Sequence, residues 1–293
     1  MRSSPLADRT VVITGAARGV GAALTREVSR RGARVALLGH EQAAMEAVAA
    51  SLPGPALAVE VDVTDPGALD AAAHTVRAGL GRPSVVVANA GIAEGGPFLA
   101  SDPSAWRRVI DVNLTGSAHT ARTFLPDLFD TAGYFLQIAS LASIGAVPLM
   151  SAYCASKAGA EAFAHALRAE VAHRGVAVGI AYLSWTDTDM IRDADRYAAL
   201  RGLRAHMPPG ARGVHPVNTV AARLARGLEC RRTAVYAPAW LRLAQPLRVA
   251  LPPVVLRVSR RELPRMEAAQ PFAYTGPLGA GGQADRAASR GGS

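Results

Sequence analysis

The chain has 293 residues, half of them hydrophobic, and a formal net charge of +9. Its two cysteines, Cys154 and Cys230, are too few for a disulfide framework or a thiolate metal site, so we expect no metal and a reducing, cytoplasmic setting. Residues 231–293 hold ten Arg against three acidic residues, a balance of +7, which leaves +2 for the rest of the chain. A basic tail on a nearly neutral body disfavours a nucleic-acid binder, and from the short polar opening of the chain we expect no secretory leader.

Short apolar runs alternate with helical patterns along the first 238 residues, as in repeated β-α units. The predicted strands are Thr10–Thr14, Arg34–Leu38, Ala56–Val61, Val85–Ala88, Tyr134–Ile138, Val176–Leu183 and Ala234–Tyr236. The predicted helices are Val20–Arg31, Gln42–Ser51, Ala68–Leu80, Ser104–Phe129, Ala155–His173 and Val217–Glu229. Short, β-branched strands separated by helices are typical of a parallel sheet buried on both faces. We therefore predict a doubly wound α/β fold with a mostly parallel, seven-stranded sheet in one domain, residues 1–238.

Three segments stand outside this pattern. Residues 189–215 form an Arg-rich insertion between a strand and a helix, which fits either a lid over a pocket or a solvated surface loop. Residues 239–275 form a basic amphipathic extension whose prolines, among them Pro246 and Pro264, should break it into short pieces. Residues 276–293 are rich in Gly, Ala, Ser and Arg, and we expect them to be disordered.

A glycine-rich loop joins the first predicted strand to the first helix. It reads Thr14-Gly15-Ala16-Ala17-Arg18-Gly19-Val20-Gly21. Glycines let the backbone turn sharply and approach phosphates closely, while the N–H groups at the start of a helix supply positive potential. The placement of this loop directly after a strand predicts a Rossmann-type dinucleotide site.

Tyr153 and Lys157 lie four residues apart in a helical stretch, so their side chains share one face of the helix. A phenol exchanges protons poorly at neutral pH, and a nearby ammonium favours its ionised form. A surface contact between the two side chains is the alternative explanation. Lys157 is, however, the single lysine beside 31 arginines, which indicates a position that requires a compact ammonium. The pair therefore predicts a general acid/base.

Further motifs follow in the same order along the chain: Asp62-Val63 after the third strand, the Asn89-Ala90-Gly91 turn, Asn113 and Ser140. Together with the glycine loop and the Tyr153/Lys157 pair, they resemble the single-domain short-chain dehydrogenases/reductases over roughly residues 8–238. This resemblance implies an NAD(P)-dependent oxidoreductase that moves a hydride between a nicotinamide and a carbonyl or alcohol carbon.

The resemblance also implies a role for each matching residue. Ser140 would hold the substrate oxygen, Tyr153 would exchange the proton, and Asn113 would hold a water that links Lys157 to solvent. Lys157 would in addition contact the nicotinamide ribose, and Asp62 with Val63 would lie at the adenine. The turn formed by Asn89, Ala90 and Gly91 would pass over the adenine ribose.

The segment after the sixth strand departs from the family, which has Pro-Gly where this chain has Leu183-Ser184. Thr188 remains in register for the nicotinamide carboxamide, and we expect Thr186 to bind the cofactor beside it. Trp185 either lines the substrate pocket or packs in the core. Ser143 and Met150 are predicted to contribute to the same substrate pocket.

Cofactor choice depends on the end of the second strand, where a carboxylate would bind a ribose diol and repel a 2′-phosphate. The residues there are Gly39 and His40, and Arg18 lies in the glycine loop. We therefore favour NADP(H), with His40 either contacting the phosphate or simply solvated. Glu41 weakens this preference and leaves NAD(H) open.

The expected pocket segments are apolar with few fixed charges, which favours a small hydrophobic ketone or secondary alcohol as substrate. A nicotinamide-binding sensor or scaffold that has lost catalysis is the alternative function. The resemblance implies a homodimer or homotetramer. The basic extension fits contact with an anionic membrane surface or packing on its own domain or a sister subunit.

Overall fold

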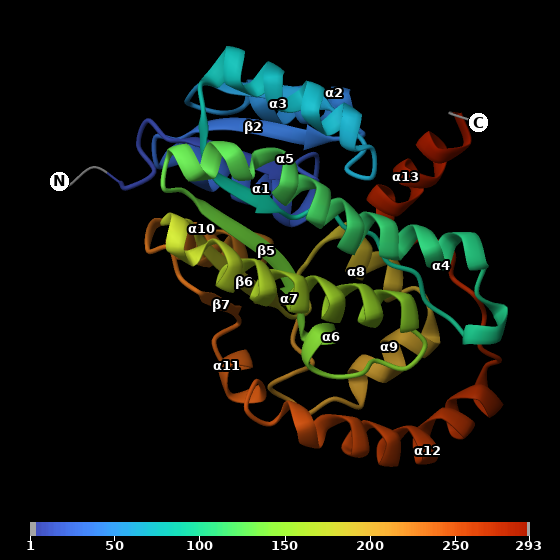
Figure 1. The fold of residues 1–293 in the computed structure, drawn as a ribbon. Coiled ribbons are helices and arrows are strands. Elements are labelled where there is room, and N and C mark those ends of the chain that lie inside the picture. The colour runs from blue at the N-terminus through green and yellow to red at the C-terminus, as the bar shows by residue number, and fades with distance from the viewer. Residues whose placement is uncertain (1–3, 292–293) are drawn as a thin grey trace.

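Seven parallel strands form one sheet in the computed structural model, which describes residues 4–291 (Figure 1). The strands lie in the order β3-β2-β1-β4-β5-β6-β7. They are β1 (Thr10–Thr14), β2 (Arg34–Gly39), β3 (Ala56–Glu60), β4 (Pro83–Ala88), β5 (Tyr134–Ser140), β6 (Ala177–Leu183) and β7 (Ala234–Ala237). The predicted doubly wound α/β fold is confirmed. The strand order reverses between β1 and β4, and ligands of such sheets bind at the carboxyl ends of the strands beside that reversal.

Helices cover both faces of the sheet because successive residues of each strand point to opposite faces. On β1, Val12 packs into one hydrophobic cluster, while Val11 and Ile13 pack into another. One face is covered by α1 (Gly19–Arg30), α2 (Gln42–Ala50) and α10 (Val217–Glu229), whose buried residues belong to the second cluster. The other is covered by α3 (Pro66–Leu80), α5 (Gly116–Asp130) and α7 (Ser151–Val171).

Two predicted helices differ from the observed ones near the site. The predicted helix Ser104–Phe129 is divided into α4 (Pro103–Ile110), a π-helical turn η2 (Asp111–Thr115) and α5. Such a turn inserts an extra residue into a helix and often marks a functional position. Helix α7 begins four residues before its predicted start, so Tyr153 lies inside its first turn.

Short helices connect the main elements. They are α6 (Leu141–Ile144), α8 (Asp189–Ala194) and α9 (Ala198–Ala205), with the 3-10 turns η1 (Phe98–Ala100) and η3 (Ala172–Arg174). Helices α8 and α9 occupy the Arg-rich insertion at residues 189–215, which is thus partly ordered by its own secondary structure.

The C-terminal extension is more helical than predicted. It contains α11 (Leu241–Ala244), a 3-10 turn η4 (Arg248–Ala250), α12 (Leu251–Ala269) and α13 (Gly279–Gly291). Pro246 does separate α11 from η4, but the predicted break at Pro264 is wrong, because Pro264 lies inside α12 without ending it. Pro252 and Pro253 lie in the first turn of α12, where a missing N–H costs nothing. None of the helices within residues 4–291 is apolar over a stretch that could cross a bilayer.

The predicted disorder of residues 276–293 is wrong for residues 279–291, which form α13, while residues 292 and 293 lie outside the described residues. Alanines favour a helix there. Leu278, just before α13, and Asp285, within it, are buried against the main domain. Figure 1 shows α13 beside α8, at the end of the chain coloured red.

Candidate active site

A cavity lies at the carboxyl ends of the central strands, where the strand order reverses. Its walls come from the glycine loop, the ends of β2, β4, β5 and β6, the first turns of α7 and α8, and α13. Of the predicted site residues, it is lined by Gly15, Arg18, Gly19, Val20, Gly21, His40, Val63, Asn89, Ala90, Gly91, Ser140, Tyr153, Lys157, Thr186 and Thr188. The fold thus brings most of the predicted cofactor and catalytic residues to one place.

The glycine loop has a backbone shape that side chains would not permit. Gly15 and Gly19 have φ angles of 64° and 53°, in the left-handed region that favours glycine. A Cβ at Gly15 would lie 2.8 Å from Ala90 Cα, and one at Gly21 would overlap the carbonyl oxygen of Gly15. Among residues 4–291, no side chain caps the start of α1, so its first N–H groups are available to an anion. The loop therefore fits a dinucleotide pyrophosphate.

The Asn89-Ala90-Gly91 turn supports this loop. Thr14 Oγ1 accepts hydrogen bonds from the backbone N–H groups of Asn89 and Ala90, at 3.0 and 3.1 Å. The Asn89 amide donates in return to the carbonyl oxygens of Thr14 and Gly15. This network ties the ends of β1 and β4 together and fixes the loop before any ligand arrives.

Tyr153 and Lys157 project from the same face of α7 into the cavity, as their spacing predicted. Lys157 Nζ lies 5.8 Å from the centroid of the Tyr153 ring and donates a hydrogen bond of 3.2 Å to the carbonyl oxygen of Ile138. The lysine is only 4% exposed, and burial lowers its pKa to about 8. The ammonium is therefore still the main form at neutral pH.

Burial raises the pKa of Tyr153, although its interaction with the Ser140 hydroxyl opposes the shift. The expected shift of the Tyr153 phenol towards its ionised form is therefore not seen, because desolvation is the largest effect on its pKa. A phenol that stays protonated is suited to give a proton to a carbonyl oxygen.

Ser140 ends β5 and caps α6. Its Oγ accepts a hydrogen bond of 3.1 Å from the N–H of Ala142, which fixes the side chain near Tyr153. Because β5 ends there and α7 begins eleven residues later, a serine and a tyrosine from separate elements share the cavity. The pair can hold and protonate one oxygen atom of a substrate.

Asn113 lies in the π-helical turn and is fully buried. Its Oδ1 accepts from the N–H of Ile92 at 2.8 Å, while its Nδ2 donates to the Ile92 carbonyl and to Ser156 Oγ. A Cβ at Gly91 would lie 3.2 Å from Asn113 Oδ1 and 3.3 Å from Lys157 Nζ. Asn113 and Lys157 are thus packed on the same glycine. The predicted water relay through Asn113 stays a prediction.

The segment of residues 183–188, which differs from the family pattern, contributes hydroxyl groups to the cavity wall. Ser184 Oγ is buried and finds no hydrogen-bond partner among the described residues, although Ser184 lines the cavity. Thr186 lies there too, with its hydroxyl donated to the Ser184 carbonyl, and Thr188 begins α8. An unpaired buried hydroxyl beside two threonines fits the amide group of a nicotinamide.

The three residues predicted for the substrate pocket do not line this cavity. Ser143 donates to the Ser140 carbonyl at 2.7 Å, and Trp185 Nε1 contacts Met207 Sδ at 3.3 Å within the insertion. Met150 packs beside Tyr153 in a small apolar cluster. Met190 and Ile191 line the cavity instead, from the insertion after β6.

The adenosine end of the cavity is rich in paired charges. Arg18 forms an ion pair with Glu41, so the arginine predicted to favour a 2′-phosphate is already engaged. Asp62 does not line the cavity: it accepts from the N–H and hydroxyl of Thr64 and from Arg108, all at 2.8 Å. Its predicted contact with the adenine stays a prediction.

Sequence reasoning missed α13 and Arg108. The tail contributes Leu278, Gly279 and Asp285 to the cavity wall, and Arg108 on α4 joins Asp285 to Asp62. The glycine content of the tail suggested disorder and hid the scattered alanines that favour the helix. For Arg108 the sequence carried no signal, because an arginine on a helix is usually solvated.

Comparison with known proteins agrees with this geometry. Residues 9–198 match a family model described as short chain dehydrogenase. A meso-2,3-butanediol dehydrogenase from Serratia marcescens is 34% identical over 184 residues, which cover 62% of this chain and 73% of that protein. The probable oxidoreductase EphD from Mycobacterium tuberculosis is 33% identical over 189 residues, 63% of this chain but 32% of EphD. The match thus spans about a third of EphD.

Two solved structures share the fold. A short chain dehydrogenase/reductase from Burkholderia phymatum, in complex with NAD, superposes with a TM-score of 0.73 at 23% identity, over 84% of this chain and 94% of that one. A short-chain type dehydrogenase/reductase from Mycobacterium marinum gives a TM-score of 0.71 at 25% identity, over 79% and 94% of the two chains.

Proposed function

This chain belongs to the short-chain dehydrogenase/reductase family, and we propose that it transfers a hydride between a nicotinamide dinucleotide and a hydrophobic ketone or secondary alcohol. In this proposal Tyr153 is the general acid/base. One observation carries it: Ser140, Tyr153 and Lys157 line the same cavity as the glycine loop. The proton-transferring group and the proposed dinucleotide-binding loop thus share one cavity.

The cofactor supplies or accepts the hydride at its nicotinamide ring. The residues that would hold it are the glycine loop with the start of α1 at the pyrophosphate, and Ser184, Thr186 and Thr188 at the nicotinamide. The close approach of Gly15 to Ala90 and the unpaired hydroxyl of Ser184 both fit such a ligand.

Proton transfer in this proposal is assigned to Tyr153 and its two neighbours. In reduction, the protonated phenol gives its proton to the carbonyl oxygen, which Ser140 holds by a hydrogen bond. The Lys157 ammonium stabilises the phenolate that results, at a distance where its charge is only weakly screened by water. Oxidation of an alcohol follows the same path in reverse.

The substrate class follows from what surrounds Tyr153. The ring packs in an apolar cluster with Leu149, Met150 and Met190. A hydrophobic carbonyl or alcohol would lose little solvation there, whereas a charged one would be left unpaired. The name of the Serratia marcescens relative points to a secondary alcohol, which agrees with this class.

A catalytically silent sensor or scaffold is the alternative. It would have no need to keep an acid/base set, yet Ser140, Tyr153 and Lys157 lie together and Asn113 packs behind them. A screen of hydrophobic ketones and secondary alcohols, followed by nicotinamide absorbance, separates the two functions. We expect turnover by the unmodified chain and a loss of at least about a hundredfold in Tyr153→Phe. Equal turnover by both would contradict the mechanism.

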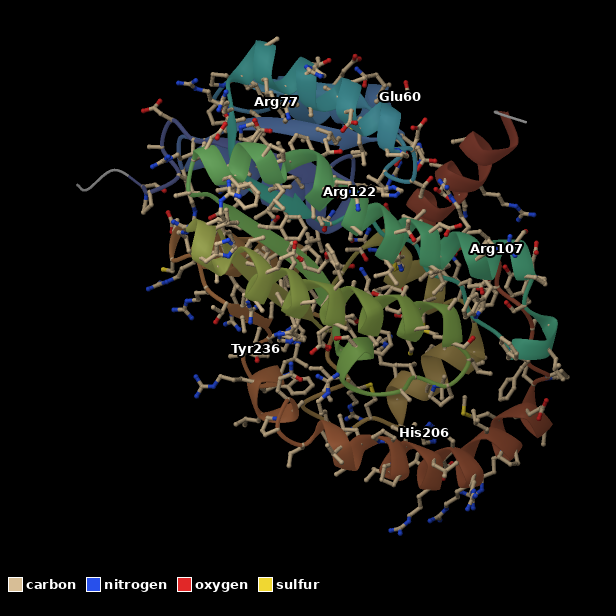
Figure 2. The ribbon with its side chains drawn as sticks, in the orientation of Figure 1. Glu60, Arg77, Arg107, Arg122, His206 and Tyr236 are labelled. Atoms are coloured by element: carbon tan, nitrogen blue, oxygen red, sulfur yellow. The ribbon has the colours of Figure 1, made fainter. Side chains whose placement is uncertain are left out.

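The C-terminal extension supports a second proposal, contact with an anionic membrane surface. Helix α12 lies at the outer edge of the molecule, and Figure 2 shows its side chains projecting away from the body. Its outward residues include Val254 and Leu256, which are 55% and 52% exposed, beside Arg257, Arg260 and Arg261. Exposed apolar groups with flanking arginines match the interface of a bilayer that carries negative charge.

Helix α12 also packs on its own domain, as the alternative interpretation of the tail predicted. Its Met266 contacts α9 at Gly202, where an added Cβ would lie 2.7 Å from Met266 Cε. His206 Nε2, just after α9, lies 3.3 Å from a Glu262 carboxylate oxygen. The helix is thus held with one side on the body and the other free to meet a surface.

A further inference from the structure

The C-terminal helix α13 forms part of the wall of the cofactor cavity. Leu278, which precedes it, is 1% exposed and packs in the apolar cluster that also contains Tyr153. The N–H of Gly279 donates to an Asp193 carboxylate oxygen at 2.8 Å, which ties the start of α13 to α8. A Cβ at Gly279 would lie 2.7 Å from the backbone of Met190, so the two segments are in direct contact. This packing holds α13 across the adenosine end of the cavity.

Asp285 is the residue of α13 that faces the end of β2. It is 4% exposed and lines the cavity. One carboxylate oxygen lies 3.4 Å from His40 Nε2, and the carboxylate accepts hydrogen bonds from Arg108 at 2.7 to 3.2 Å. Burial alone would raise the pKa of Asp285, but the hydrogen bonds from His40 and Arg108 outweigh it and lower the pKa. The carboxylate is therefore ionised at neutral pH and held in place.

Each of three cations at this end of the cavity is already paired with a carboxylate among the described residues. The cations Arg18, His40 and Arg108 contact four carboxylates, which belong to Glu41, Asp62, Asp189 and Asp285. A 2′-phosphate dianion bound beside β2 would be repelled by the ionised Asp285 carboxylate, whereas a ribose diol would donate hydrogen bonds to it.

We propose that Asp285 replaces the carboxylate that is missing at the end of β2, where Gly39 and His40 stand, and makes the site select NAD(H) over NADP(H). This inference rests on the proposed nicotinamide-dependent function and reverses the NADP(H) preference predicted from the sequence. The carboxylate comes from the far end of the chain, 245 residues after His40, by the difference of their numbers. The selectivity of the site is thus built by a segment outside the domain that carries the glycine loop.

Titration of the full-length protein with NADH and with NADPH, followed by nicotinamide fluorescence, tests this. We expect the unmodified chain to bind NADH at least about tenfold more tightly than NADPH, as one like charge in a half-buried site would produce. Asp285→Asn keeps the shape and removes the charge, so the ratio of the two dissociation constants should fall roughly tenfold. Asp285→Glu restores the charge and should keep the preference for NADH.

Asp130→Asn is the matched control, because Asp130 is an exposed carboxylate paired with Arg82 at the other end of the sheet from the cavity. It should leave the ratio unchanged. An unchanged ratio in Asp285→Asn, or tighter binding of NADPH by the unmodified chain, would overturn the role of Asp285 and leave the proposed function standing. Binding of neither nucleotide would refute both.

Salt dependence of the unmodified chain gives a second measurement that needs no variant. If repulsion excludes the 2′-phosphate, raising the salt concentration from about 0.05 to about 0.5 M should screen it and narrow the gap between NADPH and NADH. A gap that widens with salt would show that cations attract the phosphate and would contradict the inference.

Discussion

Replacing Gly91 by alanine would place a methyl group between the two polar side chains behind Tyr153. The new Cβ would lie 3.2 Å from Asn113 Oδ1 and 3.3 Å from Lys157 Nζ, closer than ordinary van der Waals contact. Three hydrogen bonds anchor the Asn113 amide, whereas a single bond to Ile138 holds the lysine. We therefore expect Lys157 to be the group that moves, by a few tenths of an ångström.

The size of the effect follows from that displacement. A misplacement of about 1 Å at an active site costs roughly a hundredfold in rate, so a shift of about 0.3 to 0.5 Å should lower kcat roughly four- to tenfold. Overpacking of a buried site should cost about 1 to 3 kcal/mol in the free energy of unfolding. Steady-state kinetics by nicotinamide absorbance and urea unfolding measure the two quantities.

Gly210→Ala is the control for this substitution. A Cβ at Gly210 would meet no heavy atom of the described residues within 4 Å, so the added methyl group should change neither kcat nor the packing. Its effect on the unfolded chain alone should stabilise the protein by at most about 1 kcal/mol. The same kcat for both variants would refute the packing of Gly91 on Lys157.

Two further predictions concern charge. Because burial lowers the pKa of Lys157 to about 8 while the unfolded chain keeps the ordinary value of 10.5, the unfolded state binds more protons between these pH values. The free energy of unfolding should therefore rise by at most about 3 kcal/mol as pH increases from about 8 to about 10.5. Urea titrations of Lys157→Met should not show this rise. For α12, vesicles with anionic lipid should bind the full chain, and the double substitution Arg257→Gln/Arg260→Gln should weaken binding roughly thirtyfold, with the exposed Arg30→Gln as control. Sedimentation that ignores the substitution, or that is equal on neutral vesicles, would contradict the membrane proposal.

Local patterns were enough to predict the sheet and the shared helix face of Tyr153 and Lys157. The strands are short apolar runs, and this composition is typical of strands that are buried on both faces. Tyr153 and Lys157 lie on a helix, whose period of 3.6 residues puts residues four apart on one face. The glycine loop could also be predicted from the sequence, because glycine readily adopts positive φ angles such as those of Gly15 and Gly19.

Features that depend on distant contacts were not readable. The disorder predicted for the tail failed because a Gly- and Ala-rich segment gains its stability from docking, through Leu278 and Asp285, on a surface that the sequence does not reveal. The raised pKa of Tyr153 likewise depends on burial by surrounding elements, which the spacing of Tyr153 and Lys157 does not reveal. The position of His40 after the second strand could be predicted, but its partner Asp285 could not, because Asp285 lies in the last helix.

Transfer of deuterium tests the central claim most directly. A reduced nicotinamide dinucleotide carrying deuterium at the transferred position would be incubated with a ketone substrate found in the screen. The mass of the alcohol product would then be measured by mass spectrometry. The account predicts one carbon-bound deuterium in each product molecule with the unmodified chain, and little or no product with Tyr153→Phe. Product without deuterium, or equal deuterated product from the Tyr153→Phe chain, would contradict hydride transfer with Tyr153 as the acid/base.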